Sequence, residues 1–439
     1  MLSQSRRAKV IGALRMNYFA AIEFLYGLRT FGAKFGLENT RRLAALAGNP
    51  HARLRFIHIA GTNGKGSTCA ILESIYRAVG LRVGLFTSPH LVAFGERIQV
   101  NRQLISENDV ARLVSEMQPL LAEFSREQHP TFFEVVTVMA MRYFAEQQCD
   151  LVIWETGLGG RLDATNIVTP LASVITNIGF DHQQWLGESL PQIAHEKAGI
   201  IKHRVPALTA CDAPDAREII QAKAREMSAP FTSISAFEIS NFQFQIPLIG
   251  EHQRTNAALA LATVNVLQSQ IPVSEDALRT GFARVHWSGR LQLHTTASGQ
   301  KWLLDGAHNP PSCVVLRAAL DRHFPQPQPA LLLGMLADKD CAQMCERLAP
   351  FARRIALAPA ASARALPVAE LHELCQRANP TAKITQHESV RAALKTLADE
   401  PFVLATGSLY IVGEVLELLG LSPSSARGER GLNEWAATK

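Results

Sequence analysis

The chain has 439 residues, of which 47% are hydrophobic and 19% charged, and it carries a net charge of +5 at pH 7. This composition is globular, and no apolar run approaches the roughly 18 residues of a membrane span. It excludes disordered, fibrous and membrane-spanning proteins, and so small a positive excess is a weak argument for a nucleic-acid partner.

The cysteines indicate a reducing compartment, and the N-terminus does not have the pattern of a signal peptide. Arg6, Arg7 and Lys9 precede an apolar stretch that Arg15 and Asn17 interrupt, and no small-residue cleavage site follows, so we expect no signal peptide. The seven cysteines form no CxxC motif and no tight cluster with histidine. We therefore expect a cytoplasmic protein.

The first half of the chain alternates strand and helix patterns. A branched apolar run at 54–60 precedes GTNGKGS at 61–67, a helical pattern at 68–80 and a strand at 81–88, which together form a βαβ unit. The more strictly alternating segment 237–248 predicts antiparallel structure. Between these regions, the patterns predict one helix and then three buried strands, at 132–148, 150–157, 172–179 and 205–210.

The alternation restarts after Arg290. Five strand patterns, each followed by a helical segment, lie at 301–306, 329–334, 353–360, 382–387 and 401–407. They predict a second doubly wound domain, with 325–329 as a surface loop. The expected fold class is α/β, with a doubly wound, mostly parallel P-loop domain over 1–289 and a smaller Rossmann-like domain over 290–439.

The glycine-rich turn at 61–67 is the strongest local signal. Its three glycines allow a tight turn that directs backbone N–H groups at phosphate oxygens, and the helix that follows adds partial positive charge. Lys65 can reach the β- and γ-phosphates. The turn departs from the usual P-loop spacing, because Ile59 and Gly66 replace a glycine and a hydroxyl residue, and the hydroxyl comes at Ser67. The turn predicts a nucleotide site.

Polar residues at three further strand ends point to a metal. Ser88, Glu155 and the pair Asp181–His182 each follow an apolar strand. The carboxyl ends of parallel strands share one edge of a doubly wound sheet, so these side chains should gather beside the phosphate loop. A hydroxyl and a carboxylate suit Mg²⁺, which prefers oxygen, whereas an imidazole is a less usual ligand for it.

The motifs GTNGKGS, TSPHL, ETGLGGRLDATN, DHxxWLG and HEKAGI occur in this order. Together they closely resemble the folylpolyglutamate synthase/dihydrofolate synthase family of Mur-ligase-like, ATP-dependent amide ligases. The resemblance continues through GEHQRTNAALA, HWSGR, LLDGAHNP, GMLADKD and ATGSLYIVGEV, and covers about residues 20 to 420.

The resemblance implies ATP and two Mg²⁺ ions as cofactors. Its phosphate-binding loop corresponds to Thr62, Asn63, Gly64, Lys65, Gly66 and Ser67. Its magnesium ligands correspond to Ser88, Glu155, His182 and Lys197. The family's lysine at this last position is carbamylated, which would turn a cation that repels Mg²⁺ into an anionic oxygen ligand. Lys65 and Lys197 are therefore candidate catalytic residues.

The resemblance also assigns the substrates. It places Asn256 at the nucleotide base, Arg290 and Asp305 on ATP from the C-terminal side, and His308 near the incoming L-glutamate as a further catalytic candidate. Its pterin-contacting segments correspond to Thr131, Phe132, Phe133 and Glu134, and to Leu162, Asp163 and Ala164. Phe132 or Phe133 could stack on the pterin, although both also suit a helix core.

Two positions depart from the family pattern. The segment 33–39 reads AKFGLEN, where the family usually has a sequence like IDLGLER. In the family this segment borders the pterin site, so the preference between the two pterin substrates stays open. Ser288 stands where the family usually has proline, while Arg290 is intact, so we expect a looser hinge.

The implied reaction adds L-glutamate to a reduced folate, and also to dihydropteroate, through an acyl phosphate. His308 and the bound phosphate are alternative proton acceptors for the glutamate amine. A cell-wall Mur ligase, a P-loop kinase or NTPase, and a basic nucleic-acid-binding protein are the alternatives. Only 60 residues precede Gly61, few for a Mur ligase, and a kinase would not need the DGAHNP domain. We expect small-molecule partners only, no nucleic acid or membrane, and a monomer.

Overall fold

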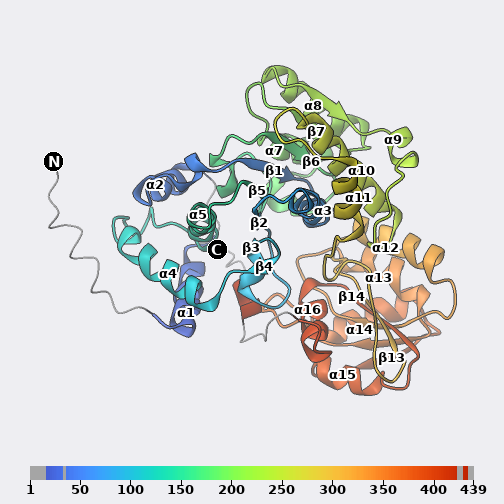
Figure 1. Ribbon diagram of the computed structural model, residues 1–439. Helices are drawn as coiled ribbons and strands as arrows, with labels where there is room; N and C mark the ends of the chain where they lie inside the picture. Colours follow the sequence, from blue (N-terminus) through green and yellow to red (C-terminus); the bar gives the residue numbers. More distant parts are fainter. Residues whose placement is uncertain (1–15, 33–35, 423–428, 434–439) are drawn as a thin grey trace, which may run out of the picture.

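The computed structural model describes residues 16–32, 36–422 and 429–433. The basic N-terminal residues up to Arg15, and positions 33–35 of the divergent loop, lie outside the described residues. Figure 1 shows two α/β units, one built from the N-terminal two thirds of the chain and one from the C-terminal third. Among the described helices, none combines the length and the apolar character that crossing a membrane requires. All seven cysteines are free and buried.

The N-terminal unit is built on an eight-stranded sheet with the order β4-β3-β2-β5-β1-β6-β7-β8. The strands from β2 to β8 in this order are parallel, and β3 and β4 are antiparallel additions at one edge. Because β5 and β6 flank β1 on opposite sides, the sheet has a topological switch point at the end of β1. The strands are β1 (Phe56–Ala60), β2 (Val83–Phe86), β3 (Ile98–Val100), β4 (Gln103–Leu104), β5 (Leu151–Glu155), β6 (Ala172–Ile175), β7 (Ala207–Thr209) and β8 (Phe231–Ser233).

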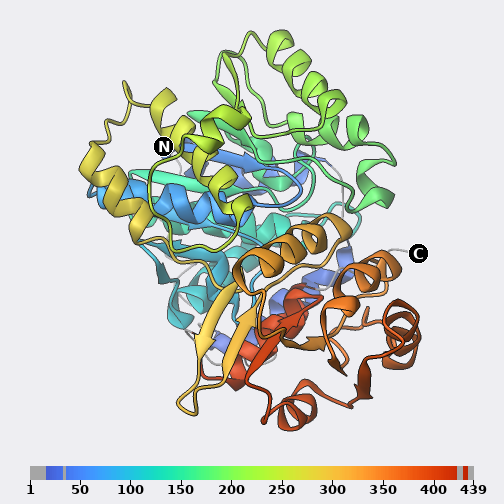
Figure 2. The same ribbon diagram turned by 90° about the vertical axis from the view of Figure 1, so that its right-hand side faces the viewer.

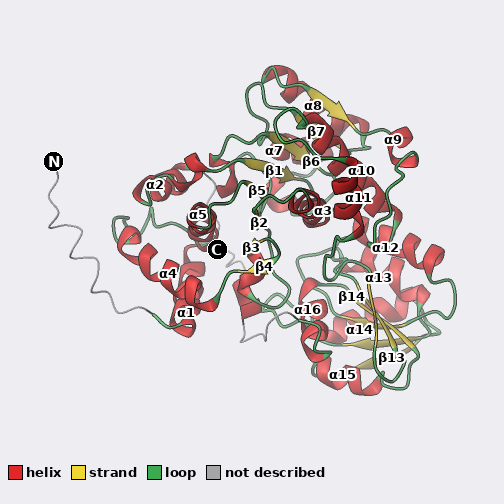
Figure 3. Ribbon diagram, in the orientation of Figure 1, coloured by secondary structure: helices red, strands yellow, loops and turns green. Residues whose placement is uncertain are grey.

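Helices cover both faces of this sheet (Figure 3). Successive residues of a strand point to opposite faces of the sheet, and here both faces are apolar. In β1, Phe56 packs into one hydrophobic cluster and Ile57 into the cluster on the other face. One face carries α1 (Tyr18–Leu28), α2 (Glu38–Leu46), α4 (Glu107–Leu121) and α5 (Phe132–Glu146). The other carries α3 (Lys65–Ala78), α10 (Glu251–Val266) and α11 (Glu275–Ala283). Near β6 and β7 lie α6 (Gln183–Leu186), α7 (Leu190–Ala198) and α8 (Pro214–Glu226), and α9 (Ala236–Ser240) follows β8.

The C-terminal unit has a six-stranded sheet with the order β13-β12-β11-β14-β10-β9. It confirms the five predicted strand–helix pairs, and adds β9, an antiparallel edge strand that the sequence patterns did not reveal. Figure 2 shows β9 and β10 side by side. The strands are β9 (Gln292–Thr295), β10 (Lys301–Leu304), β11 (Ala330–Leu333), β12 (Arg354–Leu357), β13 (Lys383–Gln386) and β14 (Phe402–Thr406). The helices are α12 (Pro310–His323), α13 (Cys341–Leu348) and α14 (Val368–Ala378) on one face, and α15 (Val390–Thr396) and α16 (Leu409–Leu418) on the other.

The expectation of antiparallel structure at 237–248 was wrong. Ser235 and Glu238 form a capping box, in which the Ser235 hydroxyl accepts from the Glu238 N–H and the Glu238 carboxylate accepts from the Ser235 N–H. This local signal starts helix α9 instead. Beyond the helix, Phe242 and Leu248 are buried against α3 and α11 without a strand partner, which explains their apolar character.

Candidate active site

The phosphate loop joins β1 to α3 at the switch point. At two positions of this loop, both the backbone angle and the closeness of neighbouring atoms require glycine. Gly61 has φ +143°, and a Cβ there would lie 1.8 Å from the Thr176 hydroxyl oxygen. Gly64 has φ +85°, and a Cβ there would lie 2.4 Å from Oδ1 of Asn256. Any other residue at either position would push the loop away from β6 or α10.

Side chains of the two residues that directly follow β6 hold the loop in place. The Asn63 N–H donates to Oδ1 of Asn177 at 2.8 Å, and the Thr176 hydroxyl donates to the Asn63 carbonyl at 2.7 Å. Lys65 folds back over the loop, and its Nζ donates to the carbonyls of Gly61 and Thr62 at 3.1 and 3.2 Å. The loop is therefore preformed, with its lysine beside the amides that begin α3.

A single cavity of about 870 Å³ lies between the two units, and every candidate residue from the sequence lines it. From the loop and the strand ends these are Thr62, Asn63, Gly64, Lys65, Gly66, Ser67, Ser88, Glu155, His182 and Lys197. From the remaining segments they are Thr131, Phe132, Phe133, Glu134, Leu162, Asp163, Ala164, Asn256, Arg290, Asp305 and His308.

Glu155 and Ser88 meet at the end of β5. Oε2 of Glu155 accepts from the Ser88 N–H at 3.1 Å, its single hydrogen bond within the described chain. Burial raises the pKa of Glu155 to about 7, against the opposing effect of the Lys65 charge. A buried carboxylate with so few donors is a site where a cation would be stabilised.

Lys197 and His182 reach the cavity from α7 and from the turn before α6. Nζ of Lys197 donates to the Gly61 carbonyl at 2.8 Å, and burial followed by the Lys65 charge lowers its pKa to about 7. Burial also lowers the pKa of His182 to about 4, so its imidazole is neutral at pH 7. Within the described chain, no three His, Cys, Asp and Glu side chains gather closely enough to hold a metal by themselves.

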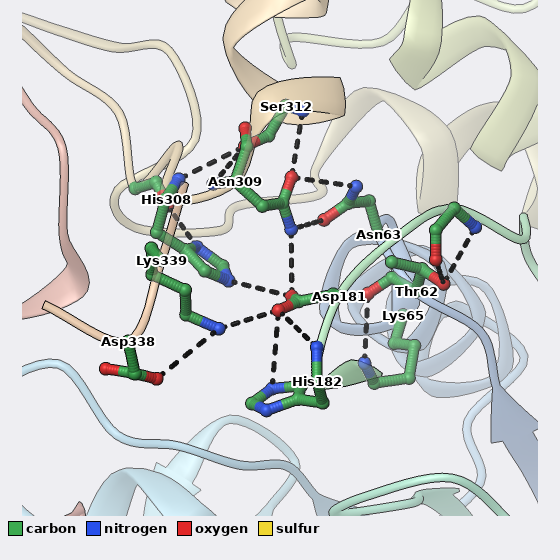
Figure 4. A network of polar contacts seen from close by, with 12 residues as sticks. Thr62, Asn63, Lys65, Asp181, His182, His308, Asn309, Ser312, Asp338 and Lys339 are labelled. Carbon is green, nitrogen blue, oxygen red and sulfur yellow. Dashed lines mark hydrogen bonds and ion pairs between the residues drawn. The ribbon is translucent and has the colours of Figure 1, made fainter. Parts of the chain in front are cut away.

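Asp181 is the centre of a polar network that joins the two units (Figure 4). Lys339 donates to its Oδ1 at 2.6 Å and Asn309 to its Oδ2 at 2.9 Å, while Nε2 of His308 lies 3.7 Å from Oδ2. Burial alone would raise the pKa of Asp181, but His182, His308 and Lys339 outweigh it and hold that pKa well below its usual value. Sequence reasoning placed Asp181 at a strand end without giving it a role.

Asp305 and Arg290 lie where the chain passes between the units. The two oxygens of Asp305 accept from the N–H groups of Leu291 and Ala307, both at 2.9 Å. Leu291 has φ +44°, an unusual backbone angle for leucine, and the Asp305 contact holds it there. The Asp305 carboxylate thus fixes the connection between the units as well as lining the cavity.

His308 has a defined tautomer. Its Nδ1 lies 2.7 Å from the Gly306 carbonyl, which can only accept, so Nδ1 carries the proton and Nε2 keeps its lone pair. Burial lowers the pKa of His308 despite the nearby Asp181 carboxylate. A neutral imidazole with a free Nε2 can accept a proton from a group in the cavity.

The segment Thr131–Glu134 begins helix α5. The Thr131 N–H donates to Glu134 at 2.8 Å and the Thr131 hydroxyl accepts from the Glu134 N–H, which is a capping box. Phe132 packs into the core cluster beneath Arg97, whose guanidinium lies 5.4 Å from the ring centre. Phe133 lies so close to Gly157 that a Cβ on this glycine would be 2.5 Å from the ring. Both phenylalanines combine a packing role with exposure to the cavity.

The segment 162–164 and Asn256 form hydrogen bonds or packing contacts in the cavity wall. The carboxylate of Asp163 accepts from the N–H groups of Leu158 and Thr165 at 2.7 and 3.0 Å, and so organises the glycine-rich turn after β5. Leu162 and Ala164 flank it. Asn256 of α10 donates to Gln253 at 3.1 Å and lies against Gly64 of the phosphate loop.

Comparisons with known proteins identify the arrangement. The Mur ligase middle domain matches residues 59–227, and the Mur ligase glutamate ligase domain matches residues 289–409. The dihydrofolate synthase/folylpolyglutamate synthase of Bacillus subtilis (strain 168) is 36% identical over 427 residues, spanning 92% of this chain and 99% of that protein. The chain belongs to the folylpolyglutamate synthase/dihydrofolate synthase family. It is an ATP-dependent glutamate ligase of this family, as the sequence predicted.

Solved structures of the family share the whole fold. Mycobacterium tuberculosis folylpolyglutamate synthase complexed with ADP and AMPPCP superposes with a TM-score of 0.84 at 29% identity, covering 93% of this chain and all of that one. E. coli FolC in complex with DHPP and ADP gives 0.81 at 30% identity, covering 93% and 99%. The predicted α/β fold class is confirmed.

Sequence reasoning missed several residues of the cavity wall. Asn177 and Lys339 brace the phosphate loop and Asp181, and Arg97 reaches the cavity from the short helix η4 (Phe94–Arg97). Asn177 and Lys339 follow strands β6 and β11, so the rule that singled out Glu155 could have found them. Arg97 precedes a strand and carries no comparable signal.

Proposed function

We propose that the chain joins L-glutamate both to a reduced folate and to dihydropteroate, through an acyl phosphate. The observation that carries this proposal is the cavity between the units, which is lined by a preformed phosphate loop, by the nearly unpartnered carboxylate of Glu155 and by the phenylalanines at the start of α5. The names of the relatives support the double activity, since those from B. subtilis and E. coli are both called dihydrofolate synthase/folylpolyglutamate synthase.

ATP would lie with its phosphates on the loop at 61–67. Lys65 would exchange its bonds to the Gly61 and Thr62 carbonyls for the γ-phosphoryl oxygens, where a cation stabilises charge during transfer. Arg290 and Asp305 would approach the nucleotide from the other unit. Asn256 would contact the base, and its position against Gly64 keeps that side chain beside the loop.

The donors present fit a magnesium ion. Mg²⁺ is commonly held by one or two carboxylates together with water and substrate phosphates, so a complete protein cage is not needed. Ser88 and Glu155 supply a hydroxyl and a carboxylate with capacity for a cation. When bound, the ion would neutralise phosphate charge.

His182 and a carbamate on Lys197 would hold a second ion. The neutral amine of Lys197 can attack CO₂, forming an N–C bond and releasing one proton, and the lowered pKa of Lys197 favours that amine. The carbamate would replace a repelling cation with an anionic oxygen ligand.

The chain's own residues then account for the two chemical steps. The substrate carboxylate attacks the γ-phosphorus, ADP leaves, and the acyl phosphate has a better leaving group than the free acid. The neutral amine of glutamate attacks the acyl carbon and inorganic phosphate leaves. Nε2 of His308 can take the proton that the amine loses, and the departing phosphate is the alternative acceptor.

We also infer that the units act as two domains, 1–289 and 290–439, that close over the substrates. The connection at Ser288–Leu291, held by Asp305, is the hinge, and closure excludes water that would hydrolyse the acyl phosphate. The Asp181 network would be a contact that closure makes.

The direct test measures glutamate incorporation with dihydropteroate and tetrahydrofolate side by side, with ADP release followed in parallel. We expect product with both acids, and ADP release that requires acid and glutamate together. Lys65→Ala is the matched inactive control. Product with tetrahydrofolate alone would contradict the double activity, and ADP release without glutamate would contradict the ligase reaction.

The carbamate has its own test. Lys197→Ala should lose activity on the order of 100-fold or more, because both the ligand and the charge disappear. Added formate or acetate should restore part of that activity by supplying a carboxylate in the vacated space. Unchanged activity, or a loss that carboxylates do not relieve, would contradict the carbamate.

A further inference from the structure

A short segment near the C-terminus returns to the N-terminal unit. Helix η7 (Glu429–Asn433) comes after α16 in the chain, yet it packs against α1 and η4 of the other unit. Leu432 is 1% exposed and belongs to the core cluster of α1, α4 and α5. Together with Asn433 it also lines the active-site cavity.

This segment is anchored to both units. Arg430 forms ion pairs with Glu414 and Glu417 of α16 on the C-terminal side. On the N-terminal side, the buried carboxylate of Glu429 accepts from the Phe94 N–H at 2.6 Å, at the start of η4. The segment thereby fixes the position of η4, at whose end Arg97 lies.

Asn433 holds the Arg97 side chain directly. Its Oδ1 accepts from Nη2 of Arg97 at 2.6 Å, and its Nδ2 donates to the His90 carbonyl at 2.9 Å. The His90 ring completes the arrangement. Its Nε2 donates to the Glu429 carbonyl at 2.9 Å, so its Nδ1 is unprotonated and accepts from Nε of Arg97, also at 2.9 Å.

Arg97 is consequently a buried cation with neutral partners. It is 3% exposed, and within the described part of the chain no carboxylate lies at ion-pair distance from its guanidinium. The adjacent Glu96 carboxylate accepts instead from the N–H groups of residues 91–93. A buried charge without a counter-ion is costly, so the cavity that Arg97 lines should receive an anion at this place.

We propose that Arg97 binds the carboxylate of the pteroate-type acid, and that Asn433 is the positioning residue which aims the guanidinium at it. The proposal rests on the proposed function, because it takes the Phe132 side of the cavity as the pterin side. Arg97 lies over the Phe132 ring, so an acid seated against that wall would bring its carboxylate within reach. The ATP phosphates would be bound by a different cation, Lys65 of the phosphate loop.

The test compares dihydropteroate, which has one carboxylate, with its uncharged carboxamide, by equilibrium binding with ADP present. Wild type should bind the acid at least about tenfold more tightly than the amide, because a charge-assisted bond is stronger than a neutral one. Arg97→Ala should remove this preference by weakening the acid alone. Asn433→Ala should reduce the preference by roughly three- to tenfold while ADP affinity stays unchanged.

The matched control is Asn379→Ala. Asn379 also donates two side-chain hydrogen bonds to carbonyls, those of Ala349 and Ala352, but it does not line the cavity. Its loss should lower stability without changing the preference for the acid. Equal weakening of acid and amide in Arg97→Ala would show that Arg97 only packs on Phe132.

Two other outcomes are decisive. An unchanged acid preference in Asn433→Ala would overturn the positioning role. A wild-type protein that binds ADP but neither dihydropteroate nor its amide would contradict the pterin assignment itself, and this inference with it.

Discussion

Glu155, the last residue of β5, and Asp181, in the turn beyond β6, are largely buried carboxylates near the two strands that flank β1, yet their surroundings differ. Glu155 accepts one described hydrogen bond, from Ser88, and its pKa is raised to about 7 by burial. Asp181 faces Lys339, Asn309 and His308 from the other unit, and its pKa is held low. The two carboxylates therefore differ in charge balance, since Asp181 has the Lys339 ammonium beside it and Glu155 has no cation at ion-pair distance within the described residues.

The largest effect in this comparison is expected at Glu155. Glu155→Gln keeps an oxygen to accept from the Ser88 N–H but removes the charge, so glutamate-dependent ADP release should fall about 10³-fold. The midpoint of thermal unfolding should not fall, because the variant no longer buries a poorly partnered carboxylate. Activity within tenfold of wild type would mean that Glu155 holds no essential cation.

A smaller loss of activity and a larger loss of stability are expected at Asp181. Asp181→Asn removes the close anion of the largely buried Lys339 ammonium and leaves only the more distant Asp338 carboxylate, 4.0 Å away, which costs about 3 kcal/mol and should lower the unfolding midpoint by roughly 5–10 °C. Activity should fall on the order of tenfold, because one contact between the units is weakened.

The double variant Asp181→Asn/Lys339→Met tests whether the lower stability of Asp181→Asn comes from the Lys339 charge that has lost its close partner. Removing both charges should restore the midpoint to within about 2 °C of wild type while activity stays low. If the double variant is as unstable as the single one, the ion pair is not the source of the stability difference.

The smallest effect is expected at Asp338, which flanks the same network. Its carboxylate pairs with Arg364 at 3.2 Å and lies 4.0 Å from Lys339, with about a quarter of the side chain exposed. Asp338→Asn should change stability by less than about 1 kcal/mol and activity by less than about twofold. A loss as large as that of Asp181→Asn would contradict the distinction between the buried and the outer pair.

Local sequence patterns predicted most of the fold. The apolar runs and helical periodicities predicted the parallel strands of both units, and the glycine-rich turn predicted the phosphate loop, because these features depend on residues close in sequence. The exception at 237–248 is instructive. Its alternation indicated a strand, but the capping box of Ser235 and Glu238 starts a helix, and the apolar residues Phe242 and Leu248 are buried against α3 and α11.

Some residues of the candidate site could likewise be predicted from local sequence, and others could not. Glu155 and Ser88 could be proposed because each lies at or just beyond the end of a strand, and the ends of parallel strands share one edge of the sheet. Arg97 could not, since it precedes β3, and its partners His90 and Asn433 lie 7 and 336 residues away in the sequence.

The sequence by itself indicated the family, most of the strands and helices, and the candidate residues for a nucleotide site, since all of these depend on short contiguous motifs. Only the tertiary structure decided which carboxylate is paired with a cation of the other unit, and which buried cation has only neutral partners among the described residues. The physical reason is that charge balance in a buried site depends on every group within a few ångströms, and here those groups come from both units and from the returning C-terminal segment.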